Sequence, residues 1–93
     1  DALDEHIRQK AEKLEEFHSR IISCRVTVEE LRKHHRQGRQ FCVSVDLRLP
    51  GREIVANRNH DEDVYIALRD AFDAARLQLE EVARQMRDVS IRS

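Results

Sequence analysis

The sequence predicts an α+β fold in which two helices pack on one face of an antiparallel sheet, in the order helix, three strands, helix. Apolar residues recur at steps of three and four near both ends of the 93-residue chain, which is the period of an amphipathic helix. Between these segments the step changes to two, the period of a half-buried strand. Pro50-Gly51 separates two of the alternating segments and is a turn pair. A chain of this length forms one domain, here residues 1–93, with a single two-layer core.

The first helix is predicted over residues 1–19. Asp1 is expected to cap it, and Asp4 and Glu5 suit the positive end of the helix dipole. Phe17 is expected beside the apolar stripe, whose members lie three or four residues apart: Leu3, Ile7, Ala11, Leu14 and His18.

The second helix is predicted over roughly residues 62–88, with Asp61 as its cap and with Glu62 and Asp63 in its first turn. Glu80 and Arg84 stand four residues apart, a spacing that favours an ion pair on the helix surface. The apolar stripe of this helix consists of Val64, Leu68, Ala71, Phe72, Ala75, Leu79, Val82 and Met86.

Three strands are predicted between the helices, and strands joined this closely must be antiparallel neighbours. The first begins at Ile22, the second spans residues 41–49 and the third spans residues 52–58. Residues 31–40 are expected to form a polar, basic hairpin loop with a glycine at position 38. The side chains expected to face the core are Ile22, Cys24, Val26 and Val28, then Phe41, Val43, Val45, Leu47 and Leu49, then Ile54 and Ala56.

The alternate residues of the strands give the sheet a second face that is polar and open. Cys24 and Cys42 fall on opposite faces under this alternation, so they cannot form a disulfide with each other. Two unpaired cysteines are typical of a reducing compartment, and we expect a cytoplasmic protein.

The net charge of −1 conceals an uneven distribution. Residues 1–19 carry three bases and six acids, and residues 61–88 carry four bases and eight acids. Residues 20–60 carry nine bases and four acids, a balance of +5. Because the local field rather than the total charge attracts a polyanion, the basic middle keeps a nucleic-acid partner open.

Several function classes find no support in the sequence. No apolar stretch approaches the roughly eighteen residues of a membrane-spanning helix, and no signal peptide is visible. There is no glycine-rich phosphate loop, no nucleophile in a recognisable setting and no convergent carboxylate pair, so we expect no enzyme. His34, His35 and His60 lack the further ligands that a zinc site needs, so neither a metal nor any other cofactor is expected.

The sharpest candidate for a functional site is the predicted hairpin loop. Its cations are interleaved with His34 and His35, and the loop holds no acid. Phosphate contact is one interpretation, and a solvated loop whose charges keep the hairpin soluble is the other. The four cations are Arg32, Lys33, Arg36 and Arg39.

The order of helix, three strands and helix is shared with double-stranded-RNA-binding domains. Those domains open their second helix with a lysine cluster, whereas here Asp61, Glu62 and Asp63 stand at that position and would repel phosphate, which weakens the case for a double-stranded-RNA-binding domain but keeps it as an alternative function.

Four segments resemble the family of ribosome hibernation-promoting factors and ribosome-associated inhibitors, also called ribosomal subunit interface proteins. The segments are AEKLEEFHSRI at 11–21, the strand ending VTVEE, PGREIVA at 50–56 and DVYIALRDAFDAARLQLE at 63–80. The opening of the second helix, with Asp63, Tyr65 and Ala67, is the most specific part. The basic hairpin and the LRLPG turn are most similar to members in which a cold-shock domain follows.

This resemblance implies a non-enzymatic protein that binds the small ribosomal subunit and its 16S rRNA in the mRNA and tRNA channel, near the decoding centre. It implies a bacterial protein that inhibits translation and promotes hibernation under stress or in stationary phase. The resemblance also implies that Lys10, Lys13 and Arg87 contact rRNA, with Arg76 and Arg84 matching less closely.

The family begins with one further strand, which pairs with the strand starting at Ile22. The chain starts at Asp1, after that strand, so we expect the domain to be incomplete at its N-terminus or completed by another chain. An edge left bare would also be a route to homodimers, so a protein-interaction module remains an alternative function.

Overall fold

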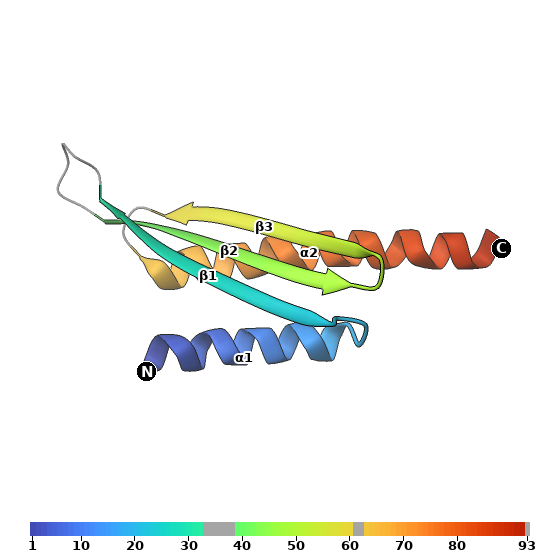
Figure 1. Ribbon diagram of the computed structural model, residues 1–93, viewed down its shortest axis with the longest axis horizontal. Helices are drawn as coiled ribbons and strands as arrows, with labels where there is room; N and C mark the ends of the chain where they lie inside the picture. The colour runs from blue at the N-terminus through green and yellow to red at the C-terminus, as the bar shows by residue number, and fades with distance from the viewer. Residues whose placement is uncertain (33–38, 61–62, 93) are drawn as a thin grey trace.

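The computed structural model describes residues 1–32, 39–60 and 63–92, with the backbone alone at residues 32, 39, 59 and 88–92. The predicted element order is confirmed (Figure 1). The elements are helix α1 (Ala2–Phe17), strands β1 (Ser23–Arg32), β2 (Arg39–Leu49) and β3 (Arg52–His60), and helix α2 (Val64–Arg92).

The three strands form one antiparallel sheet in the order β1-β2-β3. The register places Val26 opposite Val45 and Val45 opposite Ala56, so the apolar alternation of each strand continues across the sheet. At the turn between β2 and β3, Gly51 has a φ of 73°, a left-handed conformation that glycine adopts without strain.

Both hairpins are longer than the sequence predicts. Leu31 pairs with Gln40 and the backbone of Arg32 pairs with that of Arg39, so the predicted loop at 31–40 is wrong at both ends. β3 likewise runs two residues further, to His60. Backbone ladders can extend through polar residues, because the hydrogen bonds join main-chain groups whatever the side chains are.

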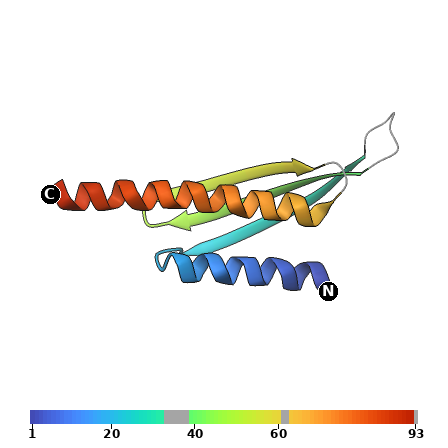
Figure 2. The ribbon, with the colours of Figure 1, turned by 180° about the vertical axis from the view of Figure 1, so that it is seen from behind.

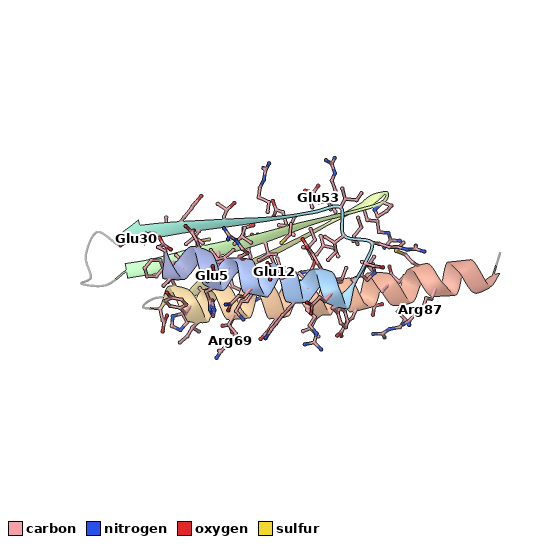
Figure 3. The ribbon with its side chains drawn as sticks, turned by 90° about the horizontal axis from the view of Figure 1, so that it is seen from below. Glu5, Glu12, Glu30, Glu53, Arg69 and Arg87 are labelled. Carbon is pink, nitrogen blue, oxygen red and sulfur yellow. The ribbon has the colours of Figure 1, made fainter. Side chains whose placement is uncertain are left out.

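Both helices cover the same face of the sheet. α2 crosses behind the strands in Figure 1 and in front of them in Figure 2, while α1 lies along the β1 side. Seen from below in Figure 3, the strands form one layer and the helices another, which leaves the second face of the sheet uncovered. The predicted two-layer arrangement is therefore confirmed.

The core lies between these layers and joins the central strand to α2. Val43, Val45 and Leu47 of β2 and Leu68 and Leu79 of α2 are fully buried. α1 contributes one fully packed residue, Leu14, while Ile7 and Ala11 are partly buried against the core. Six of the eight residues predicted for the stripe of α2 are buried or pack against the core, whereas Val64 and Met86 are only partly buried and lie outside it. Ala67 and Ala74 are buried in addition. α2 continues past the end of the sheet (Figure 1), and its fully buried residues end at Leu79.

The helix ends differ in part from the prediction. Asp1 caps α1 as expected, its Oδ1 accepting from the Asp4 amide at 2.9 Å. α1 ends at Phe17, so His18 is its C-terminal cap rather than a member of the apolar stripe; the His18 amide donates to the Leu14 carbonyl oxygen. Asp63, not Asp61, caps α2: its Oδ1 accepts from the Tyr65 amide at 2.9 Å.

Two further expectations at the start of α2 change with that cap. The helix runs Val64–Arg92 rather than over residues 62–88, and its first turn holds no acid, because Asp63 precedes it. Asp61 and Glu62 lie outside the described residues.

The start of β1 also differs from the prediction. Ile22 was predicted to face the core, but its side chain is 63% exposed, and Ile21 packs against the core instead. Cys24, Val26 and Val28 do face the core, yet each is only half-buried. Within the described residues, β1 has a paired strand on one side alone. The additional strand stays a prediction.

Candidate nucleic-acid interface

The two helices enclose an open groove of about 360 Å³ between their outward faces. This size is at the lower end of the roughly 300–1,000 Å³ that small-molecule pockets occupy. We call it the interhelical groove, and its walls are Lys10, Lys13, Leu14, Phe17, Phe72, Asp73 and Arg76. Lys10, Lys13 and Arg76 are three of the cations that the resemblance implies, so the fold brings them together.

The cations of α1 gather on this side because of the helical period. At 3.6 residues per turn, Lys10, Lys13 and Phe17 share the side that faces α2. Glu12, Glu15 and Glu16 fall on the other side of the same helix. α1 therefore presents positive charge to the groove, although it carries more acids than bases.

Ion pairing does not neutralise the lysines of the groove. Neither Lys10 nor Lys13 makes an ion pair with another described residue. Arg76 is engaged twice, through an Nε contact with Glu80 at 3.3 Å and through its guanidinium carbon 5.3 Å from the centroid of the Phe17 ring. Exposed ion pairs of this kind hold little free energy, about 0–1 kcal/mol, and can exchange for a phosphate.

Two further hollows continue the groove toward the end of α2. One, of about 320 Å³, is lined by His18, Arg20, Ala83, Met86 and Arg87. The other, of about 480 Å³, is lined by Phe17, His18, Glu80, Ala83, Arg84 and Arg87. Figure 3 shows Arg87 well along α2, beyond the end of α1.

We call the three hollows together the cationic strip. Among the described residues, its walls carry six bases, Lys10, Lys13, Arg20, Arg76, Arg84 and Arg87, and two acids, Asp73 and Glu80. A molecule with a net charge of −1 thus has one elongated surface with a clear excess of positive charge.

The strip contains residues that sequence reasoning missed as functional. Arg20 lies in the short connection after α1, and the sequence gives no sign that this connection folds back beside Arg87. Phe17 was predicted to lie beside the apolar stripe, yet its side chain is 49% exposed and lines two of the hollows. The predicted pairing of Arg84 with Glu80 is also wrong: Arg84 contacts Glu81 at 3.5 Å, and Glu80 pairs with Arg76.

The basic hairpin is the other candidate site that the sequence predicts. Lys33 and Arg36 lie outside the described residues, and Arg32 and Arg39 are described by their backbone alone, as the last pair of the β1–β2 ladder. In Figure 1 that end of the ladder lies on the same side as the start of α1, whereas Arg87 lies toward the opposite end of the molecule.

The comparisons place the chain among known proteins. No curated protein matches it. In the described part of the chain, no helix combines the length and the apolar content that crossing a bilayer requires. A family model described as Sigma 54 modulation protein / S30EA ribosomal protein matches residues 1–87. Double-stranded-RNA-binding domains share the element order, but the matched model is that of the ribosome-associated family. The chain therefore belongs to the S30EA ribosomal protein family, whose members are non-enzymatic modulators of the ribosome, and this membership implies a role in ribosome-associated inhibition of translation and in hibernation.

Proposed function

We propose that this protein binds the small ribosomal subunit through the cationic strip, in the channel that mRNA and tRNA use near the decoding centre. Occupying that channel would exclude both ligands and keep idle ribosomes intact under stress or in stationary phase. A cytoplasmic location in a bacterium accompanies this role. The observation that carries the proposal is the strip itself, with six bases and two acids on the walls of three adjoining hollows.

The geometry of the strip suits RNA better than a small acidic ligand. Its cations come from both helices and from the connection after α1, and they follow the long axis of a molecule measuring 56 × 27 × 17 Å. An extended row of lysines and arginines matches the repeating phosphates of a nucleic-acid backbone. The three hollows that form the strip are open to solvent, which fits a partner that is itself large and structured.

The test is cosedimentation of the full chain with purified small subunits over a series of salt concentrations. In the Lys10→Glu/Lys13→Glu double variant we expect binding to fall at least tenfold. The dependence of log affinity on log salt should become shallower by roughly 1.5, because each lost phosphate contact removes about 0.7–0.9.

Arg25→Glu/Arg48→Glu is the matched control, because it changes the net charge by the same amount on the uncovered face of the sheet, outside the strip. Its affinity should stay within about threefold of the unchanged protein. If both double variants lose binding equally, net charge rather than the strip governs the interaction. We also propose that the basic hairpin contacts phosphate. Changing Arg32, Lys33, Arg36 and Arg39 together to glutamate should then weaken binding in the same assay, and unchanged binding would contradict this role.

A second candidate function is self-association through β1. The observation that favours it is the half-buried row of Cys24, Val26 and Val28 on a strand that, among the described residues, pairs on one side only. An edge strand with unpaired main-chain groups is a template for another strand.

A further inference from the structure

We propose that the interhelical groove is a subsite for one unpaired RNA nucleotide, whose base stacks on the Phe17 ring while its phosphate lies against Lys10 and Lys13. This inference deepens the proposed function and rests on it. The proposed function rests on the cations of the strip, whereas this inference gives Phe17 a role in recognising one base of the RNA.

The first observation is that packing does not explain the position of Phe17. It is the last residue of α1, its side chain is 49% exposed, and it stands apart from the residues that pack against the core. A single exposed aromatic residue is common on protein surfaces and is no signal alone. The signal is the set of groups around it.

The second observation is that the ring stands among cations in a hollow. The Arg76 guanidinium lies over the ring at 5.3 Å from its centroid, and Lys13 and Lys10 line the same groove about one and two turns earlier on α1. Leu14 and Phe72, each 5% exposed, form an apolar floor. The groove therefore offers a flat apolar surface, a planar cation and two ammonium groups that form no ion pair with any described residue.

This combination selects a ligand that is planar at one end and anionic at the other, which describes a nucleotide. A base stacked on an aromatic ring and on a guanidinium plane is the usual way in which proteins hold single-stranded RNA. A base inside a duplex is stacked on both sides and cannot reach the ring. The partner is therefore a looped-out or single-stranded segment, not a regular helix.

The charges in the groove also determine the orientation of the bound nucleotide. Asp73 lines the groove beside Arg76 and Phe72, and its carboxylate has no partner among the described residues. A carboxylate repels phosphate, so the phosphate must lie toward the lysines of α1 and the base toward Phe17 and α2.

The chain contains no tryptophan, so Phe17→Trp installs a single fluorophore of this type at the proposed stacking site. We expect its fluorescence to be quenched when a six-residue oligoadenylate binds, since stacking with a base quenches indole emission. A blunt-ended RNA duplex without unpaired nucleotides, supplied at the same total phosphate concentration, should leave the emission unchanged. Val55→Trp is the control, because Val55 is 46% exposed on a strand outside the groove. Equal quenching by duplex and single strand, or equal quenching at both positions, would overturn the proposal.

A second measurement uses the otherwise unchanged chain and small subunits. Phe17→Leu keeps the apolar bulk and removes the aromatic face, so affinity should drop about fivefold to a hundredfold. The salt dependence should stay the same, because no phosphate contact is lost. Phe17→Tyr restores the aromatic face and should restore the affinity.

The two experiments separate failure of this inference from failure of the proposed function. If the unchanged chain does not bind small subunits, the proposed function is wrong. If it binds them and Phe17→Leu binds equally well, the nucleotide subsite alone is wrong. Circular dichroism of each variant checks that the fold is retained.

Discussion

At the scale of single residues, Cys24 shows how its surroundings change one group. It faces the core from β1 and is half-buried. Burial raises the pKa of the Cys24 thiol, and the charges of Glu15 on α1 and Asp46 on β2 raise this pKa further. Only the thiolate is a strong nucleophile, so Cys24 should be an inert thiol at neutral pH.

We predict that, in a Cys42→Ser background, the midpoint of the pH profile for alkylation of Cys24 by iodoacetamide lies above that of a cysteine in a short peptide. Glu15→Gln removes one of the charges that oppose the thiolate, and it should move the midpoint down.

Glu12→Gln is the control for that experiment, since Glu12 is not among the groups that act on Cys24. It should leave the midpoint unchanged. A midpoint at or below that of the peptide would contradict the assignment.

The same scale shows what the sequence can predict of the site. Lys10 and Lys13 could be assigned to one exposed face of a helix from their spacing alone. That their partner across the groove is Arg76 depends on how α1 and α2 pack, which periodicity does not specify. Ile21 and Ile22 are adjacent apolar residues where the chain changes from helix to strand, and alternation alone chose the wrong one to face the core.

At the scale of elements, the start of α2 depends on one side chain. Asp63 Oδ1 accepts from the Tyr65 amide, and the Asp63 carbonyl oxygen accepts from the Ala67 amide at 3.1 Å. The Asp63 amide in turn donates to His60 Nδ1 at 3.2 Å, which ties the helix start to the end of β3.

We therefore predict that Asp63→Ala lowers the free energy of unfolding in urea by about 1 kcal/mol, within the roughly 0.5–2 kcal/mol measured for lost helix caps. Asp61→Ala removes the same charge two residues earlier and should cost less than half as much. A larger loss of unfolding free energy from Asp61→Ala than from Asp63→Ala would indicate that Asp61, the residue predicted from the sequence, is the cap.

The elements themselves could be predicted, but their ends could not be. Three consecutive acids, at positions 61–63, each satisfy the rule for a cap, and only the backbone geometry decides among them. Leu31 and Gln40 stand in a polar stretch of sequence that is typical of a loop, yet the β1–β2 ladder extends through them. The middle of the apolar stripe of α2, from Leu68 to Val82, was predictable because its positions agree on one period, whereas Val64 and Met86 at its two ends lie outside the core.

At the scale of the whole molecule, ribosome binding through the cationic strip and self-association through β1 predict different behaviour of the purified chain. If β1 associates with a second copy, static light scattering should give a mass approaching twice 11.0 kDa as concentration rises. Such association buries apolar and main-chain groups, so it should be nearly independent of salt, unlike RNA binding.

The Lys10→Glu/Lys13→Glu variant serves as the comparison for that measurement. It should lose ribosome binding and keep any self-association, since the lysines lie on the groove and not on β1. A monomer at every concentration would remove self-association as a candidate and leave the ribosomal proposal untouched.

The overhang of α2 gives the cationic strip two mechanically different halves. Up to Leu79 the helix rests on the sheet, but beyond it Val82, Ala83 and Met86 are only partly covered. Helical turns without a packed neighbour are marginal in water, and they are the first to open. We therefore expect Lys10, Lys13 and Arg76 to be held more rigidly than Arg84 and Arg87, so that the end of α2 can adjust to the contour of an irregular partner.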